Sequence, residues 1–84
     1  PKPDAVFIGG GASDELISKI IRLIPKKGRL VVNGVTLETQ QLIIDKQKNF
    51  GGSLKKIEIS NSKNLGSKSI WEPSFPIVQW SYLK

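Results

Sequence analysis

The chain has 84 residues, which suits one small domain or part of one, because chains of this size bury only about 60% of their unfolded surface. Its 38% hydrophobic and 24% charged residues exclude a disordered or fibrous protein. The absence of Cys and His removes thiolate and imidazole catalysis, disulfides and the usual zinc ligands, so no metal site is expected. No apolar run approaches the roughly 20 residues that cross a bilayer, so no membrane partner is expected either.

The net charge of +6 favours an acidic partner. Eleven of the 13 basic residues are lysines, and they are spread in ones and twos without an arginine cluster. This spacing is more typical of an ordinary solvated surface than of a nucleic-acid patch.

The first predicted element is a strand over residues 5–8. Its four residues are all apolar and lie between Pro3-Asp4 and three glycines, which is typical of a strand buried on both faces. Because the chain starts at Pro1 rather than at methionine and enters a core strand almost at once, the sequence indicates a piece of a longer protein.

A helix is predicted next, from a cap at Ser13 to a stop at Pro25. Asp14 and Glu15 suit the positive end of its dipole. Its inward stripe is formed by the apolar residues at helical spacing, Leu16, Ile17, Ile20, Ile21 and Ile24.

A second strand over residues 29–33 completes a βαβ unit with a right-handed crossover. Thr36 is the predicted cap of a second helix over residues 37–49, which ends at a glycine pair. Leu42, Ile43 and Phe50 are expected to point inward.

Two further strands are predicted from alternating patterns. Residues 54–60 place Ile57 and Ile59 on one face, and residues 77–83 place Val78, Trp80 and Tyr82 on one face. The 16-residue connection between them, residues 61–76, is expected to be a long loop that is functional or mobile.

The predicted order is therefore β-α-β-α-β-β in an α/β fold. A first strand that needs neighbours on both sides favours the second half of a doubly wound sheet, with residues 1–84 forming a single partial domain. A small, self-contained α/β domain is the alternative.

Three consecutive glycines form the first candidate site. Gly9, Gly10 and Gly11 join a strand to a helix, where a ligand can approach the backbone closely and meet exposed amides. Asp14 stands where a dinucleotide fingerprint requires its third glycine, so that motif is absent. A tight structural turn explains the glycines equally well.

A second candidate segment follows the second strand at the same edge of the sheet. Asn33 and Thr36 can orient a ligand by hydrogen bonds, and Glu38 can bind one or accept a proton. Helix capping explains Thr36 and Glu38 more simply. Trp71, in the long connection, is the better candidate for stacking on a flat ligand, whereas Trp80 is expected to pack in the core.

Several segments, in order, resemble the decarboxylating precorrin-6Y methyltransferases of cobalamin biosynthesis, specifically their C-terminal domain. The segments are residues 3–11, 25–39, 65–66, 71–73 and 76–80. The resemblance implies the C-terminal half of a Rossmann-like class I S-adenosylmethionine-dependent methyltransferase fold, strands four to seven of a seven-stranded sheet, with the last strand antiparallel. Gly34 departs from the family pattern, which leads us to expect Ala there.

The resemblance also implies a function. A tetrapyrrole is methylated at C15 from S-adenosylmethionine and loses the carboxyl group of its C12 acetate, in a cytoplasmic homo-oligomer. The implied cofactor-binding residues are Gly9, Gly10 and Gly11, and the main cofactor loop is expected upstream of this chain, so that this piece alone is inactive. The implied substrate-binding residues are Asn33, Val35, Thr36, Leu37, Glu38, Leu65, Gly66 and Trp71.

Other functions fit the composition. The charge of +6 and two tryptophans are compatible with a small basic module that binds single-stranded nucleic acid. An assembly domain without a ligand is a third possibility.

Overall fold

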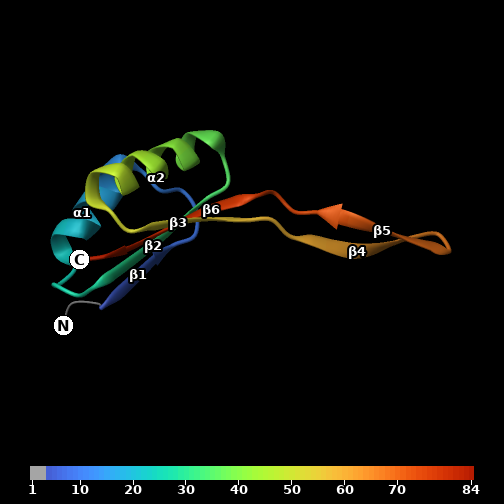
Figure 1. Cartoon of the computed structure of the whole chain (residues 1–84), viewed down its shortest axis with the longest axis horizontal. Coiled ribbons are helices and arrows are strands. Elements are labelled where there is room, and N and C mark those ends of the chain that lie inside the picture. The colour runs from blue at the N-terminus through green and yellow to red at the C-terminus, as the bar shows by residue number, and fades with distance from the viewer. Residues whose placement is uncertain (1–3) are drawn as a thin grey trace.

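The computed structural model describes residues 4–84 and has two regions: a body (residues 4–57 and 77–84) and a projecting arm (residues 58–76) that contains a hairpin (Figure 1). The chain measures 54 × 27 × 19 Å along its principal axes. Residues 1–3 lie outside the described residues, and with them the start at Pro1 and the Pro3 boundary of the first strand. No helix in the described part of the chain is long and apolar enough to span a membrane.

Helices and strands alternate in the first part of the chain, and only strands follow. The elements are β1 (Ala5–Ile8), α1 (Asp14–Leu23), β2 (Arg29–Gly34), α2 (Leu37–Phe50), β3 (Ser53–Ile57), β4 (Ser60–Leu65), β5 (Lys68–Pro73) and β6 (Ile77–Leu83). The body sheet has the order β1-β2-β6-β3, in which β1 and β2 are parallel and β6 is antiparallel to both of its neighbours. This confirms the α/β class and the antiparallel last strand.

Helix α1 is stabilised at both ends. Ser13 Oγ accepts a hydrogen bond from the Leu16 amide at 3.1 Å, as the sequence predicted. At the other end, Lys84 Nζ donates to the carbonyl oxygens of Ile21 at 2.6 Å and Ile24 at 2.9 Å. An ammonium group at the C-terminal carbonyls satisfies acceptors that the helix leaves free and complements its dipole.

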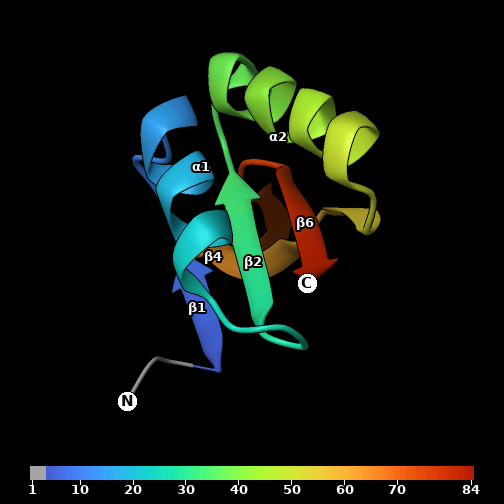
Figure 2. The same ribbon diagram turned by 90° about the vertical axis from the view of Figure 1, so that its left-hand side faces the viewer.

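Both helices pack on the same face of the sheet (Figure 2). Lys46 of α2 connects them, because it pairs with Asp14 of α1 and donates to Ser18 Oγ at 3.2 Å. The same ammonium group lies 5.7 Å from the ring centroid of Phe50, within the range of a cation–π contact.

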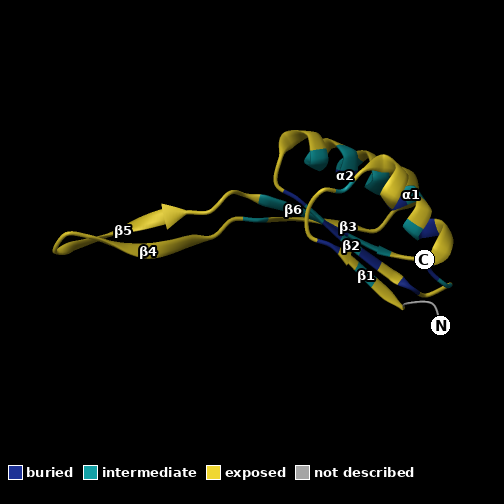
Figure 3. Cartoon of the chain, turned by 180° about the vertical axis from the view of Figure 1, so that it is seen from behind, coloured by how far each residue is buried: buried dark blue, intermediate teal, exposed yellow. Residues whose placement is uncertain are grey.

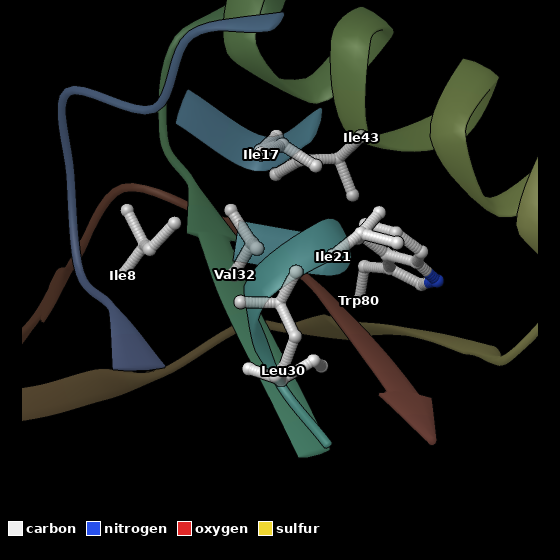
Figure 4. Close-up of a cluster of buried hydrophobic side chains, with 8 residues drawn as sticks. Ile8, Ile17, Ile21, Leu30, Val32, Ile43 and Trp80 are labelled. Atoms are coloured by element: carbon white, nitrogen blue, oxygen red, sulfur yellow. The ribbon is translucent and has the colours of Figure 1, made fainter. Parts of the chain in front are cut away.

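The core lies between this helical layer and the sheet (Figure 4). Its largest member, Trp80, is fully buried and donates from Nε1 to the Gly51 carbonyl oxygen at 2.8 Å. The eight buried hydrophobic residues are Ile8, Ile17, Ile21, Ile24, Leu30, Val32, Ile43 and Trp80. The prediction that Trp80 packs in the core is confirmed.

The opposite face of the sheet carries no layer from residues 4–84. Side chains alternate along β1, so Ile8 is buried beneath the helices while Phe7 is 63% exposed on the other side. The expectation that this strand is buried on both faces is therefore not met within this chain.

The sequence-based prediction was wrong for residues 61–76. This connection is not a long loop but the hairpin of β4 and β5, with Gly66 in the left-handed conformation (φ +63°) at its turn. Every residue of both strands is exposed. A strand exposed on both faces has no alternating apolar pattern, which is why the sequence did not indicate it.

Smaller corrections concern the ends of the predicted elements. Strand β3 ends at Ile57, so Ile59 lies outside it and is 53% exposed. Leu16 lies at the edge of the helical stripe and is 39% exposed. Phe50 is 43% exposed and contacts the edge of Tyr82, with ring centroids 6.0 Å apart, so it borders the core without entering it.

Candidate functional site at the carboxyl edge of the sheet

The parallel strands β1 and β2 end at the same edge of the sheet, and each leads directly into a helix. Ile8 is paired with Val32, so the backbones that continue from these residues leave neighbouring strands, roughly 4.8 Å apart. Helices α1 and α2 both begin at this edge. Two helix N-termini present free amides and the positive ends of their dipoles, which suits a polar or anionic ligand group.

The three glycines form the open part of this edge. A Cβ added at Gly10 or Gly11 would meet no atom within 4 Å, whereas one at Gly9 would lie 3.1 Å from the Phe7 ring. Gly11 has φ +67°, a conformation that favours glycine. A ligand can therefore reach the backbone of Gly10 and Gly11 without displacing protein atoms.

Asn33 lies at the end of β2 and is half-buried. Its Oδ1 accepts a hydrogen bond from Gln79 Nε2 of β6 at 3.0 Å. This contact fixes the orientation of the Asn33 amide on the face of the sheet that the helices leave uncovered.

Gln40 holds the same edge from the helical side, and the sequence analysis missed it. Its Nε2 lies 3.2 Å from the carbonyl oxygens of both Gly34 and Val35, and 3.5 Å from that of Pro76. One amide thus connects the exit of β2 with the entrance to β6. No local pattern marks such a residue, because its three partners come together only in the folded chain.

Thr36 has the structural role that the sequence offered as its simpler explanation. Its Oγ1 accepts from the Thr39 amide at 3.2 Å and donates to Thr39 Oγ1 at 3.0 Å. Glu38 is exposed in the first turn of the helix. Val35 and Leu37 flank the cap, and their exposed fractions are 46% and 80%. They form an exposed apolar surface at this edge of the sheet.

The other three predicted substrate residues do not join this group. Leu65 and Gly66 lie at the turn of the hairpin and Trp71 lies on β5, in the region that projects away from the body (Figure 1). The structure therefore brings Gly9 to Gly11 and Asn33 to Glu38 together at one edge and leaves Leu65, Gly66 and Trp71 apart from them.

Residues 1–84 match the sequence model of a family described as the precorrin methyltransferase domain. The chain belongs to this family. It is 39% identical to the decarboxylating precorrin-6Y C(5,15)-methyltransferase of Sinorhizobium sp, and 31% identical to the enzyme of the same name from Mycobacterium tuberculosis. It spans only 21% and 22% of the lengths of these relatives.

Solved structures agree with this assignment. The chain superposes on the C-terminal domain of the Rhodobacter capsulatus precorrin-6Y C5,15-methyltransferase with a TM-score of 0.91 at 38% identity, covering all of this chain and 46% of that one. The putative precorrin-6Y C5,15-methyltransferase domain of Corynebacterium diphtheriae gives a TM-score of 0.92 at 35% identity, covering all of this chain and 50% of that one. The fold is therefore a part of the Rossmann-like precorrin methyltransferase domain.

Proposed function

We propose that this chain is the second half of the decarboxylating methyltransferase domain of a precorrin methyltransferase in cobalamin biosynthesis. The complete protein would methylate C15 of the tetrapyrrole and remove the carboxyl group of its C12 acetate. The observation that carries this proposal is the family match over residues 1–84, together with two helix N-termini and an open glycine turn at one sheet edge.

The residues at this edge fit an approach by S-adenosylmethionine. The space beside Gly10 and Gly11 is open, and the amides after them lead into the N-terminus of α1. S-adenosylmethionine, when bound, supplies an activated methyl group. Most of its contacts are proposed to come from the half of the domain that precedes this chain, so that residues 1–84 alone are inactive.

Substrate binding is proposed at the second segment. Val35 and Leu37 would contact the apolar plane of the macrocycle. Asn33 and Glu38 would face its polar substituents. Thr36 contributes by fixing the helix cap. With no Cys or His in the chain, these residues contribute positioning and exclusion of water, which is the larger requirement for transfer of an activated methyl group to a ring carbon.

An assay of the complete protein tests the proposal. Incubation with S-adenosylmethionine carrying a labelled methyl group and a precorrin substrate is expected to give a methylated macrocycle and an equivalent of carbon dioxide. If neither product forms, the proposal is overturned.

The nucleic-acid alternative has one residue in its favour, because Trp71 is 74% exposed. Trp80 is fully buried with its indole N–H committed to Gly51, so it offers no stacking surface. We therefore propose a tetrapyrrole partner and no nucleic acid, in a cytoplasmic homo-oligomer. Tight binding of single-stranded RNA at low salt, lost on replacing Trp71, would reverse this preference.

A further inference from the structure

The side of the body sheet that faces away from α1 and α2 is called the uncovered face below (Figure 3). Because side chains alternate along a strand, this face carries the strand residues that alternate with core residues such as Ile8, Val32 and Trp80. Two of these residues are cations, Arg29 and Lys55, and none of those in the four strands is acidic. The charge on the uncovered face therefore favours an anionic ligand group.

Three polar residues form a row across the uncovered face, near the carboxyl edge of the sheet. Gln79 of β6 is paired with Asn33 of β2 on one side and with Lys55 of β3 on the other. Neighbouring strands lie roughly 4.8 Å apart, so the row spans roughly 10 Å. The next pair toward the arm, Ile57 and Ile77, is apolar. The row thus places two amides and one ammonium group beside an apolar surface.

A hydrogen bond within the row determines which atom Asn33 offers to a ligand. Gln79 Nε2 donates to Asn33 Oδ1 at 3.0 Å, and both side chains are half-buried. Because the oxygen of Asn33 is used, its Nδ2 is left to donate. Gln79 therefore orients Asn33 as a donor toward an oxygen atom of a ligand.

Lys55 supplies the charge of the row. It is exposed, and no carboxylate of residues 4–84 forms an ion pair with it. The next residue, Lys56, points to the opposite side of β3 and lies 3.4 Å from the carboxylate of Glu58. The two adjacent lysines therefore differ, because only Lys55 places an uncompensated cation beside the Asn33 donor.

A carboxylate matches these two donors. One of its oxygens can accept a charge-assisted hydrogen bond from the Lys55 ammonium group while the other accepts from Asn33 Nδ2. The proposed tetrapyrrole substrate carries several carboxylate arms, and its plane is apolar, as is the surface beside the row. This inference rests on the proposed function.

The chemistry of decarboxylation indicates which kind of arm suits Lys55. Loss of carbon dioxide leaves the bonding electron pair on the macrocycle, so negative charge moves away from the carboxylate. An ammonium group paired with that carboxylate would stabilise the ground state more than the transition state and would slow the step. Lys55 therefore suits an arm that keeps its carboxyl group.

We propose that Asn33, Gln79 and Lys55 recognise one retained carboxylate arm of the tetrapyrrole substrate. Lys55 acts as the counterion and Asn33 Nδ2 as the hydrogen-bond donor. Gln79 is a positioning residue that acts through Asn33. The row holds the macrocycle in register with the carboxyl edge, where the glycine turn admits the methyl donor.

Steady-state kinetics of the complete protein test the role of Lys55. Lys55→Met is expected to raise KM for the tetrapyrrole about tenfold, because a hydrogen bond to a charged group is lost. The kcat and the KM for S-adenosylmethionine should stay close to wild type, since the arm binds equally in the ground and transition states. The difference from wild type should shrink at high salt.

Two cations of the same chain provide matched controls. Lys56→Met removes the neighbouring charge on the opposite side of β3, and Arg29→Met removes the other cation of the uncovered face, roughly 13 Å from Asn33 along β2. Both are expected to keep the wild-type KM for the tetrapyrrole. An equal rise in KM in all three variants would reflect net charge alone and would overturn the proposal.

Gln79→Glu tests the positioning role. The substituted side chain keeps its size, but it cannot donate to Asn33 Oδ1 and it places a negative charge between Asn33 and Lys55. KM for the tetrapyrrole should rise at least as far as in Lys55→Met, again with kcat close to wild type. A wild-type KM in Gln79→Glu contradicts the assignment.

The same experiments separate this inference from the proposed function. If the complete wild-type protein converts the precorrin but Lys55→Met has the wild-type KM, only the carboxylate row is overturned. If the wild-type protein gives no product, the proposed function fails and the row fails with it. Urea unfolding is the last control: Lys55→Met should be as stable as Lys56→Met, and a loss of stability confined to Lys55→Met, with an unchanged KM, would assign Lys55 to packing and overturn the proposal.

Discussion

Trp80 in the body and Trp71 in the arm are the same residue type in opposite surroundings. Trp80 is fully buried, packs against Tyr82 with ring centroids 5.4 Å apart, and has its indole N–H bonded. Trp71 is 74% exposed and lies directly opposite Ser62 in the ladder. Trp80 stabilises this chain, whereas the exposed Trp71 ring can contact another molecule.

The difference extends to the two regions as a whole. The body buries apolar side chains from three strands and two helices in one cluster. The arm has no buried residue in either strand. Substitutions in the body should therefore lower folding stability more than substitutions in the arm.

The largest expected effect is that of Trp80→Ala. Loss of a buried tryptophan should lower the free energy of unfolding by about 3–5 kcal/mol, because a cavity opens in the core. Urea unfolding of the complete protein, followed by circular dichroism, measures the change. Trp71→Ala is the matched control and should stay within about 0.5 kcal/mol, because Trp71 is 74% exposed. Equal losses in the two variants would remove the distinction between the regions.

Gly34→Ala should have the next largest effect on the free energy of unfolding. A Cβ at this position would lie 2.8 Å from Ile43 Cδ1 and 3.1 Å from Thr39 Cγ2, so the Ile43 side chain or α2 itself must shift. We expect a loss of about 1–3 kcal/mol in the same unfolding experiment. Gly10→Ala, which meets no atom within 4 Å, is the control and should be close to neutral. A stabilising Gly34→Ala would show that this position accommodates a methyl group without strain.

Gly10→Val separates binding from folding at the candidate site. The added side chain enters open space, so stability should be nearly unchanged, but it occupies the ligand's approach to the backbone. Methyl transfer by the complete protein is expected to fall by about tenfold or more, equivalent to roughly 1.4 kcal/mol of transition-state binding. Wild-type activity in this variant would remove the glycine turn from the site.

Gln40→Ala should have the smallest effect. It removes hydrogen bonds to the carbonyl oxygens of Gly34 and Val35, with an expected loss of about 1 kcal/mol. Gln41→Ala is the neighbouring control, because Gln41 donates to Asp45 Oδ1 on the exposed surface of the helix. Equal free energies of unfolding for the two variants would show that Gln40 does not stabilise this edge of the sheet.

Local pattern was enough to predict most of the body. The Ser13 and Thr36 caps and the buried positions Ile17, Ile21 and Ile43 all follow from rules that act within a few residues. The glycine turn and the exit of β2 were correctly placed at one edge, because parallel strands end together.

Non-local pairing was not predictable from the same rules. Strand β4 consists mainly of serine, asparagine and lysine, and only its ladder with β5 makes it a strand. The three carbonyl contacts of Gln40 and the bond from Gln79 to Asn33 likewise join residues that are distant in sequence or separated by a turn. Resemblance supplied Leu65, Gly66 and Trp71 as binding residues without indicating how far from the edge they lie.

Hydrogen exchange of the complete protein, measured by mass spectrometry with and without S-adenosylmethionine, tests most directly whether the carboxyl edge binds the donor. Ligand is expected to slow exchange in peptides covering residues 9–16 and to leave residues 60–73 unchanged. If only the arm were protected, and residues 9–16 exchanged as fast as in the ligand-free protein, the assignment of the site would be contradicted.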